Sequence, residues 1–429
     1  MRVDILAIGS RGDVQPYVAL ALGLRKAGFG ARVVTLGGFE DLVGNRGMDH
    51  LAVGESPGAI AGTDAGRDWV KQRRSAGGFL QGFVRVAGPL IEQGLANYWN
   101  GPRDAEAIIV SPMGMLIGGH LAEKLGVPLI QANLAPPVLP SRYDWDGRRN
   151  WKSALGGKIF PLVHDAFHLV VWTKLRAMTN AARARVLGLA PLPASGPPGI
   201  KRLPMLAGFS SAVVTPPPDW RDGIHVTGYW FLSDNSGWSP PNEMMNFLGS
   251  GAPPVFAGFG STPFPQPEVA TAMVVRAIER SGNRGIVLAG GSGLATGRLS
   301  SNVYSIDSAP HDWLFPRVCA AIHHGGAGVT GAALRAGLPS VVVPVFADQP
   351  FWGRRVHSLG VGPRPIPATK LTEDNLAEAI RATSSAEMRA RATRLGQRIR
   401  AEDGVANAVA SFSRLVGRGV AAGRRQHAG

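Results

Sequence analysis

The sequence predicts an α/β protein in which two doubly wound parallel-sheet domains face each other across a cleft. The length of 429 residues suits two or three domains. Short apolar runs alternate with segments of helical spacing in two separate parts of the chain, which is typical of parallel sheets. A stretch rich in proline and glycine separates those parts. Together these observations favour two similar domains joined by a connector.

The first run of alternation begins at the N-terminus. Apolar segments typical of strands occur over residues 3–8, 31–37, 105–112 and 127–133. Between the first two, the spacing becomes helical from Pro16 and ends near "RKAGFG". The helix-like segment "GMLIGGHLAEKLG" separates the last two. This order of strand, helix and strand predicts one parallel sheet.

The middle of the chain has a different composition. Residues 134–160 and 191–245 are rich in proline, glycine and tryptophan. We expect the first segment to be an irregular loop that lines a pocket, and the second to contain the connector. The segment "FHLVVW" (167–172) is predicted to be an amphipathic core helix, with a membrane anchor as the alternative. The expected divisions are a first domain over 1–215, a linker over 216–245, a second domain over 246–405, and a C-terminal helix that crosses back to the first domain, with a tail, over 406–429.

The second run of alternation predicts the second sheet. Its expected strands lie within 253–261, 285–291, 303–308, 320–326 and 339–346, and its clearest expected helices lie near 267–282 and 328–336. Cys319 is the one cysteine, which excludes an internal disulfide framework and fits a reducing compartment.

Charge and hydropathy narrow the classes of partner. The net charge of +15, from 45 basic and 30 acidic residues, favours anionic partners. The chain carries no zinc-ligand spacing, helix-turn-helix signature or basic stripe interleaved with aromatic residues, so we expect no nucleic-acid partner. We find no pattern of a signal peptide or a membrane-spanning segment and expect a cytoplasmic protein. Peripheral contact with an anionic membrane on its inner face stays open, and the oligomeric state is left undetermined.

Glycine-rich turns follow the strands of both halves, but they do not match the common nucleotide motifs. "GSRG" after the first strand is not G-x-G-x-x-G, and the chain has no G-x-x-x-x-G-K-[ST] loop. In "HHGGAGV" (323–329), a strand ends in two histidines and glycines lead into a helix. Exposed amides and a helix N-terminus at such a turn suit a diphosphate. A tight turn without a ligand is the alternative, and "GFGS" (258–261) is a second Gly/Ser turn of the same kind.

At these residues the chain resembles a known family. The segment "HDWLFPRV…HHGGAGVTGAALRAGLPSVVVPVFADQPFWGRRVHSLGVGP", together with "GSRGDVQPYVALALGL", resembles family 1 glycosyltransferases of the GT-B fold. The similarity is greatest to sterol glucosyltransferase-like enzymes and to actinobacterial enzymes that glycosylate glycopeptides or glycopeptidolipids. The resemblance implies two Rossmann-like domains. It also implies transfer of a hexose or deoxyhexose, with inversion, from a UDP- or dTDP-sugar to a hydroxyl of a lipophilic or polycyclic acceptor. It implies no metal and no cofactor beyond the sugar nucleotide as co-substrate.

The resemblance assigns the base that accepts the acceptor's proton to Asp13. Relatives often carry histidine in this loop, but here the first histidine is His50. The alternative is that Asp13 only caps the following helix, since an aspartate shortly before Pro16 fits an N-terminal cap. The neighbouring donor loop is implied to comprise Ser10, Arg11 and Gly12.

The resemblance places the donor mainly in the second domain. The implied diphosphate ligands are Ser261, His324, Gly325, Gly326, Gly328 and Thr330. Relatives usually carry a hydroxyl residue at the position of Val329, so Thr330 or the backbone would have to compensate. Asp348 and Gln349 are implied to bind the donor sugar.

The nucleobase and acceptor sites are less fully specified. Many relatives stack the base on a tryptophan where this chain has Ser308, so Ser308 and His311 are the implied base contacts and the choice between uracil and thymine stays open. The implied acceptor contacts are Asn133 and Trp145. Two other functions stay open: a non-catalytic protein that binds nucleotide sugars, and another GT-B enzyme such as an epimerase.

Overall fold

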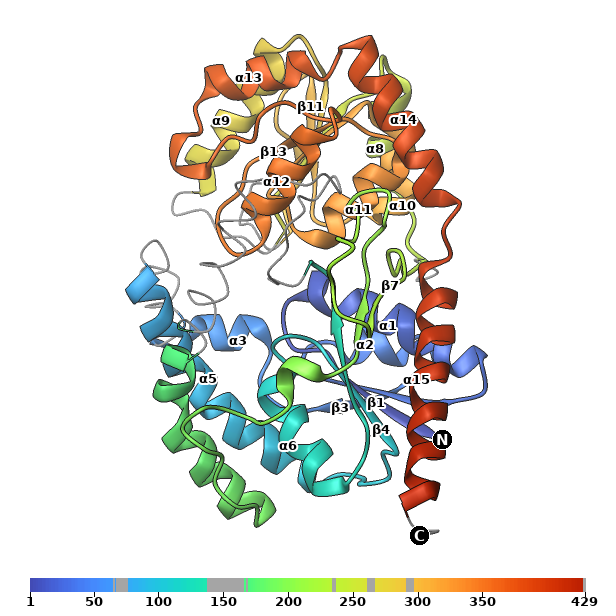
Figure 1. Cartoon of the computed structure of the whole chain (residues 1–429). Helices are drawn as coiled ribbons and strands as arrows, with labels where there is room; N and C mark the ends of the chain where they lie inside the picture. Colours follow the sequence, from blue (N-terminus) through green and yellow to red (C-terminus); the bar gives the residue numbers. More distant parts are fainter. Residues whose placement is uncertain are drawn as a thin grey trace. The chain divides into compact units, whose positions relative to one another are not determined.

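The computed structural model describes residues 1–64, 66, 76–136, 166, 169–233, 237–260, 267–290 and 297–426. The chain divides into two compact units (Figure 1). The first unit comprises Met1–Trp230 and Asp403–Gly429, and the second comprises Phe231–Glu402. Each unit is built on its own sheet, as expected from the two runs of alternating strands and helices.

The first unit contains a seven-stranded sheet of order β3-β2-β1-β4-β5-β6-β7, in which every pairing is parallel. Its strands are rich in Val, Ile, Leu and Ala, and the central strands are buried because helices cover both faces. The strand order reverses between β1 and β4. The bounds are β1 (Arg2–Leu6), β2 (Gly30–Thr35), β3 (Asp49–Ala52), β4 (Ala107–Val110), β5 (Leu129–Asn133), β6 (Met205–Ala207) and β7 (Ile224–Val226).

The helix after β1 begins earlier than the sequence predicts. Helical spacing was expected from Pro16, but α1 starts at Arg11 and includes the proline in its second turn. Ser10 ends the preceding loop in an extended conformation, which lets the helix start directly after it. The helical segments of the unit are α1 (Arg11–Lys26), α2 (Glu40–Gly44), α3 (Pro57–Gly62), α5 (Ala76–Trp99), α6 (Met115–Leu125), a π-helical turn (Arg183–Leu187), a 3-10 turn (Ile200–Arg202) and α15 (Gly404–Gln426).

The C-terminal helix α15 packs on α1, which makes it part of the first unit (Figure 1). A Cβ at Gly23 would lie 2.3 Å from a methyl carbon of Val405, so the two helices approach closely there. The ring of Phe412 meets Phe29 edge to face at 5.3 Å. The side chain of Asn407 donates to the Thr227 carbonyl at 3.0 Å, which ties α15 to the end of β7.

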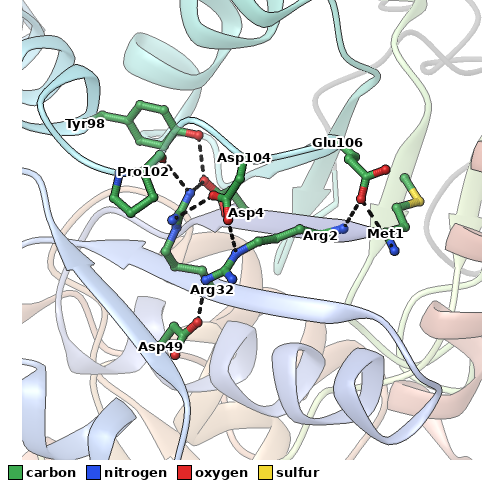
Figure 2. Close-up of polar contacts among 9 residues, drawn as sticks. All are labelled: Met1, Arg2, Asp4, Arg32, Asp49, Tyr98, Pro102, Asp104 and Glu106. Atoms are coloured by element: carbon green, nitrogen blue, oxygen red, sulfur yellow. Dashed lines mark hydrogen bonds and ion pairs between the residues drawn. The ribbon is translucent and has the colours of Figure 1, made fainter.

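A polar network around the buried pair Asp4 and Arg32 joins β1 to its neighbours (Figure 2). The carboxylate of Asp4 accepts from Arg32 and from the hydroxyl of Tyr98, each at 2.6 Å. Arg32 also donates to the Pro102 carbonyl at 3.0 Å and pairs with Asp104 at 3.2 Å. Burial raises the pKa of Asp4, and the hydrogen bond from Arg32 opposes that rise. Since Asp4 and Arg32 are register partners, the network links β1 to β2 by side chains as well.

Of the segment "FHLVVW" (167–172), the structure describes residues 169–172. Residues 169–182 are helical. Leu169 and Val170 are 50% and 47% exposed, whereas Leu175 and Ala182 are buried. Within the described part of the chain, no helix combines the length and apolar character needed to cross a bilayer.

The second unit contains a six-stranded sheet of order β10-β11-β9-β8-β12-β13, parallel except for β10. Here the order reverses between β8 and β12. Apolar clusters pack on both faces of the sheet, so the central strands are again fully buried. The bounds are β8 (Val255–Gly258), β9 (Gly285–Leu288), β10 (Gly297–Arg298), β11 (Val303–Ile306), β12 (Ala320–His323) and β13 (Ser340–Val342).

The expected linker, 216–245, divides between the units. The strand β7 joins the first sheet and Trp230 is 3% exposed within that unit, whereas the chain from Phe231 onward belongs to the second. The return to the first unit occurs after Glu402. The helical segments of the second unit are α8 (Asn242–Gly249), α9 (Pro267–Arg280), α10 (His311–Leu314), α11 (Ala327–Ala336), α12 (Gln349–Ser358), α13 (Glu373–Ala382), α14 (Ala386–Arg400) and the 3-10 turns Phe315–Arg317 and Ala368–Lys370.

Candidate functional site

In each sheet, the strand order indicates where a ligand would bind, at the carboxyl ends of two central strands. In doubly wound sheets, ligands bind outside the carboxyl ends of the strands where the strand order reverses. In the first unit this point lies between β1 and β4, and in the second between β8 and β12. The turns that follow these strands carry most of the residues singled out by the sequence. The two turns are called here the first elbow (Gly9–Asp13) and the second elbow (His323–Gly328).

The first elbow is held together by Asp13. Both the N–H and the hydroxyl of Ser10 donate to Asp13 Oδ2, each at 2.8 Å. Asp13 is the third residue of α1, and the residue at the cap position is Ser10. Gly9 adopts a φ of +152°, and a Cβ there would lie 2.6 Å from Asp13 Oδ2. The carboxylate therefore occupies a position that only glycine at residue 9 leaves open.

The environment of Asp13 favours a basic carboxylate. Desolvation by the surrounding protein raises the pKa of Asp13 above the ordinary aspartate value, and the two hydrogen bonds from Ser10 oppose this rise. The residue nevertheless keeps exposed surface, as do Arg11 and Gly12 beside it. A carboxylate with a raised pKa and solvent access can accept a proton from a hydroxyl that reaches it.

Asn133 and the turn after β4 border the same sheet edge. The hydroxyl of Tyr17, one turn after Asp13, donates to the Ala132 carbonyl at 2.6 Å, which ties α1 to the end of β5. Asn133 follows directly and is partly exposed. The hydroxyl of Ser111 accepts from the Ile8 N–H at 3.2 Å, which joins the end of β4 to the residue just before the first elbow.

The second elbow places His324 between two glycines. A Cβ at Gly260, after β8, would lie 3.0 Å from His324 Cε1, and a Cβ at Gly326 would lie 2.6 Å from Nε2. The imidazole therefore fits because both neighbours lack side chains. Burial lowers the pKa of His324 to about 4, so the ring is neutral at pH 7. A neutral imidazole can donate one hydrogen bond to a phosphate oxygen.

The helix α11 begins at this elbow without a side-chain cap. Gly326 is its cap residue, and its first turn contains no acidic residue. The N–H of Thr330 makes the first bond within the helix, to the Gly326 carbonyl at 3.0 Å. The preceding amides have no partner within the helix and carry its partial positive charge. Gly328 is exposed, whereas Thr330 is fully buried, so solvent reaches the first turn of the helix but not the threonine side chain.

Gly325 contributes its conformation to the elbow. Its φ of +89° lies in the region that favours glycine, and a Cβ would lie 2.7 Å from Val342 Cγ1. Its N–H donates to Nδ1 of the fully buried His323 at 3.1 Å. The Gly325 amide is thus already bonded within the chain. Of the predicted backbone donors, those of Gly326 and Gly328 are the ones that the elbow presents.

The start of α12 lies against the second elbow, because a Cβ at Gly325 would approach the Gln349 carbonyl to 3.1 Å. Gln349 Oε1 accepts from the N–H groups of Val345 and Phe346, at 2.8 and 3.2 Å, which leaves the amide NH₂ as the end able to meet a ligand. Asp348 Oδ2 accepts from the indole of the buried Trp352 at 2.9 Å.

Ala347, just before this pair, has a φ of +55°. A non-glycine residue in this region is strained by about 1–3 kcal/mol, and such strain is concentrated at functional turns. The strained residue sets the direction in which the chain enters α12 at Asp348. No pattern in the sequence indicates this conformation, since alanine normally avoids it.

Of the two residues implied to contact the nucleobase, Ser308 is exposed and His311 packs against another ring. Ser308 is exposed in the loop between β11 and α10. The ring of His311 stacks on Phe315 at 4.5 Å. Ser261 and Trp145 lie outside the described residues. Within the described ranges, no group of three or more His, Cys, Asp or Glu side chains is arranged to hold a metal ion.

The sequence alone missed several residues that shape these elbows. Ser111 joins two turns through one hydroxyl, Gly260 makes room for His324, and His323 bonds Gly325. The signal for the first two was present, since each follows a strand that borders a reversal of strand order. In the sequence, His323 is only one of two histidines at the end of a strand, which gives no signal of this hydrogen bond.

Two family models match the chain, one in each half. Residues 3–142 match the glycosyltransferase family 28 N-terminal domain. Residues 283–412 match the C-terminal domain of proteins like erythromycin biosynthesis protein CIII. The first match contains the first elbow and the second contains the second elbow with the start of α12.

Relatives and solved structures resemble the chain along nearly all of its length. A sterol 3-beta-glucosyltransferase of Emericella nidulans is 36% identical over 96% of this chain but only 30% of its own length. Sterol 3-beta-glucosyltransferase UGT80B1 of Arabidopsis thaliana is 33% identical over 96% of this chain and 68% of its own. The chain thus spans less than a third of the fungal relative. The structure of glycosyltransferase VinC in complex with DTDP superposes with a TM-score of 0.66 at 16% identity, covering 97% of this chain and 100% of VinC. The chain belongs to the sterol glucosyltransferase-like group of the GT-B glycosyltransferases.

Proposed function

We propose that this protein transfers a hexose or deoxyhexose from a UDP- or dTDP-sugar to a hydroxyl of a lipophilic or polycyclic acceptor, with inversion at the anomeric carbon. The observation that carries the proposal is the second elbow. An uncapped helix N-terminus, glycines and a neutral histidine meet where the strand order reverses. The names of the plant and fungal relatives support a sterol-like acceptor.

The second elbow would hold the diphosphate of the donor. The amides of Gly326 and Gly328 and the imidazole of His324 would donate to phosphate oxygens, and the dipole of α11 would stabilise the charge that develops as the diphosphate leaves. Because these groups neutralise the leaving group, the proposal requires no metal and no further cofactor. Ser261 is proposed as a ligand from the opposite turn. Thr330, which is buried, would act through its position in α11.

The start of α12 would orient the sugar. Asp348 and the NH₂ group of Gln349 would bond neighbouring sugar hydroxyls, with both side chains held by the contacts to Trp352 and to the 345–346 amides. The nucleobase would lie near Ser308 and His311. The proposal includes UDP-sugars and dTDP-sugars alike as donors.

Asp13 would act as the general base. The acceptor oxygen would form a bond to the anomeric carbon as its proton passes to Asp13, and the bond from that carbon to the diphosphate would break with its electron pair leaving on the phosphate. The raised pKa of Asp13 suits this role, and Ser10 fixes one carboxylate oxygen. Arg11 and Gly12 would border the donor, while Asn133 and Trp145 would contact the acceptor. Contact with an anionic membrane, for which the net charge of +15 is suited, would bring a lipid acceptor within reach.

The test begins with nucleotide binding. Thermal unfolding is measured with UDP, dTDP and GDP, and sugar transfer to a sterol is then assayed with the corresponding sugar nucleotide. We expect UDP or dTDP to raise the unfolding temperature and the matching donor to support transfer. Binding without transfer to any hydroxyl acceptor would favour a non-catalytic binding protein, and an absence of binding to all three nucleotides would contradict the proposal.

A further inference from the structure

We propose that His323 is a positioning residue of the donor site: its Nδ1 holds the Gly325 N–H and thereby turns the following amides of the second elbow toward the diphosphate. This inference rests on the proposed function, because it assigns the means by which that site is shaped. His323 itself does not touch the ligand, since it is fully buried.

The geometry is that of a side-chain turn. His323 Nδ1 accepts from the N–H two residues ahead at 3.1 Å, the same connection that aspartate and asparagine make when they start a turn. The carbonyl of His323 accepts from the Val343 N–H at 2.9 Å, which fixes the residue to β13. Gly325 is then left at a φ of +89° against Val342. The strand end, the turn and the neighbouring strand are therefore bound together through one residue.

The burial of His323 supports a role beyond packing. A leucine or valine would fill an interior strand position without polar atoms, and a buried polar atom without a partner costs about 1–3 kcal/mol. Among the described residues, His323 Nε2 has no partner. Burial and the nearby His324 and His311 lower the pKa of His323 to about 3, so the ring is neutral at pH 7. A neutral ring with Nδ1 as acceptor carries its proton on Nε2, at the unpartnered position. The hydrogen bond from the Gly325 N–H to Nδ1 offsets that cost.

The hydrogen bond from Gly325 to His323 sets the direction in which the chain enters α11. Because the Gly325 N–H points back to His323, the chain reverses at Gly325 and the next residue, Gly326, starts α11 as its cap. Without the bond, Gly325 could adopt many conformations, since glycine is the least restricted residue. The amides of Gly326 and Gly328 would then have to be ordered by the ligand at a cost in affinity.

The test compares three substitutions. His323→Asn places an amide oxygen where Nδ1 lies and can accept from the same N–H. His323→Leu removes the acceptor at similar size, and His323→Gln keeps a polar amide but places it one bond further out. Dissociation constants for UDP, dTDP, uridine and thymidine are measured by calorimetry on each folded variant. Selective ¹⁵N labelling of histidine reports the tautomer of His323 in the unaltered chain without any ligand.

We expect His323→Asn to bind the diphosphates within about threefold of the unaltered chain, and His323→Leu and His323→Gln to bind them about tenfold more weakly. Affinity for the nucleosides should be unchanged in all three. Equal binding by all variants, equal losses for nucleosides and diphosphates, failure of His323→Asn to restore affinity, or a proton on Nδ1 would each overturn the inference. If the unaltered chain binds no nucleotide, the proposed function itself falls, which is a distinct result. Should His323→Leu not fold, the pair His323→Asn and His323→Gln decides.

Discussion

The two elbows begin alike and end differently. Each follows a buried strand at a reversal of strand order, and each has a glycine in an unusual conformation before a helix. In the first elbow the third residue of the helix is Asp13, whose carboxylate accepts from the cap residue Ser10. In the second the third helical residue is Val329, and the helix has no side-chain cap.

The difference explains how one local design could serve the two roles proposed above. A helix N-terminus attracts negative charge. In the first elbow the negative charge at the helix N-terminus is the carboxylate of Asp13, which Ser10 holds in place as a candidate base. The second elbow has an apolar residue at the matching position and a neutral histidine beside it, so an anion from outside is the natural complement.

Replacing the carboxylate of the first elbow should give the largest loss. Asp13→Asn keeps size and the hydrogen bond from Ser10 but cannot accept a proton, so we expect the rate of transfer to fall by about 10²–10⁴-fold. Affinity for the nucleotide should not change. The measurement is steady-state transfer together with calorimetric titration of the nucleotide, and undiminished transfer would assign the base elsewhere.

The same carboxylate predicts the acid limb of the pH profile. A base must be deprotonated, so transfer by the unaltered chain should decline as the pH falls through the pKa of Asp13. Since that pKa is raised, the decline should begin at a higher pH than an ordinary aspartate would give.

Substitution of Gly9 by alanine, which would displace the carboxylate, should reduce transfer and leave nucleotide affinity unchanged.

Giving the second elbow an acid should close it to the donor. Val329→Asp places a carboxylate at the third helical position, as in the first elbow, where it can cap α11 and repel the diphosphate. We expect affinity for UDP or dTDP to fall about 100-fold, the effect of roughly 2–3 kcal/mol of charge repulsion at a partly exposed site. Val329→Thr is the matched control and should bind at least as tightly as the unaltered chain. An unchanged affinity in Val329→Asp would contradict the assignment of the diphosphate to this elbow.

The histidines of the second elbow should make stability depend on pH. The pKa of His323 is lowered to about 3 in the folded chain, so the unfolded chain binds more protons below pH 6.5. Stability from this group is therefore present above pH 6.5 and is lost as the pH falls toward 3, by about 2 kcal/mol at pH 5. Urea unfolding at pH 7 and pH 5 should show a smaller difference for His323→Asn than for the unaltered chain. An equal difference in both would show that His323 does not carry this dependence.

The smallest effect is expected from removal of metal ions. Because amides and a helix dipole are proposed to stabilise the leaving diphosphate, EDTA should leave the rate of transfer within about twofold. The check is transfer measured after dialysis against chelator, with and without added Mg²⁺. A loss restored by Mg²⁺ would show that the second elbow does not suffice to neutralise the charge.

The sequence predicted the fold class well because buried parallel strands leave a clear signal. Runs such as "VDILAI" and "AAIHH", alternating with helical segments, are typical of parallel strands covered by helices, and the structure confirms two such sheets. The start of α1 was misplaced because Pro16 resembles a first helical residue, whereas it is accommodated in the second turn. The positions of the glycine-rich turns followed from the strand ends.

Features that depend on local geometry could not be predicted. The use of the Gly325 amide by His323 requires a turn that no residue pattern specifies. The positive φ of Ala347, just before the start of α12, runs against the preference of alanine. The side-chain Oε1 of Gln349 accepts from two backbone amides, which the sequence motif does not reveal. These contacts are properties of the assembled turn.

The return of α15 to α1 affects the order in which the protein can be completed during synthesis. The second unit is one continuous segment, Phe231–Glu402, and all of it has been translated before the residues of α15 that meet Gly23 and Phe29. Until then, the apolar surface of α1 that α15 covers lies bare in the nascent chain. The unit that starts at the N-terminus is therefore the later of the two to be finished, a reversal of the usual order on the ribosome.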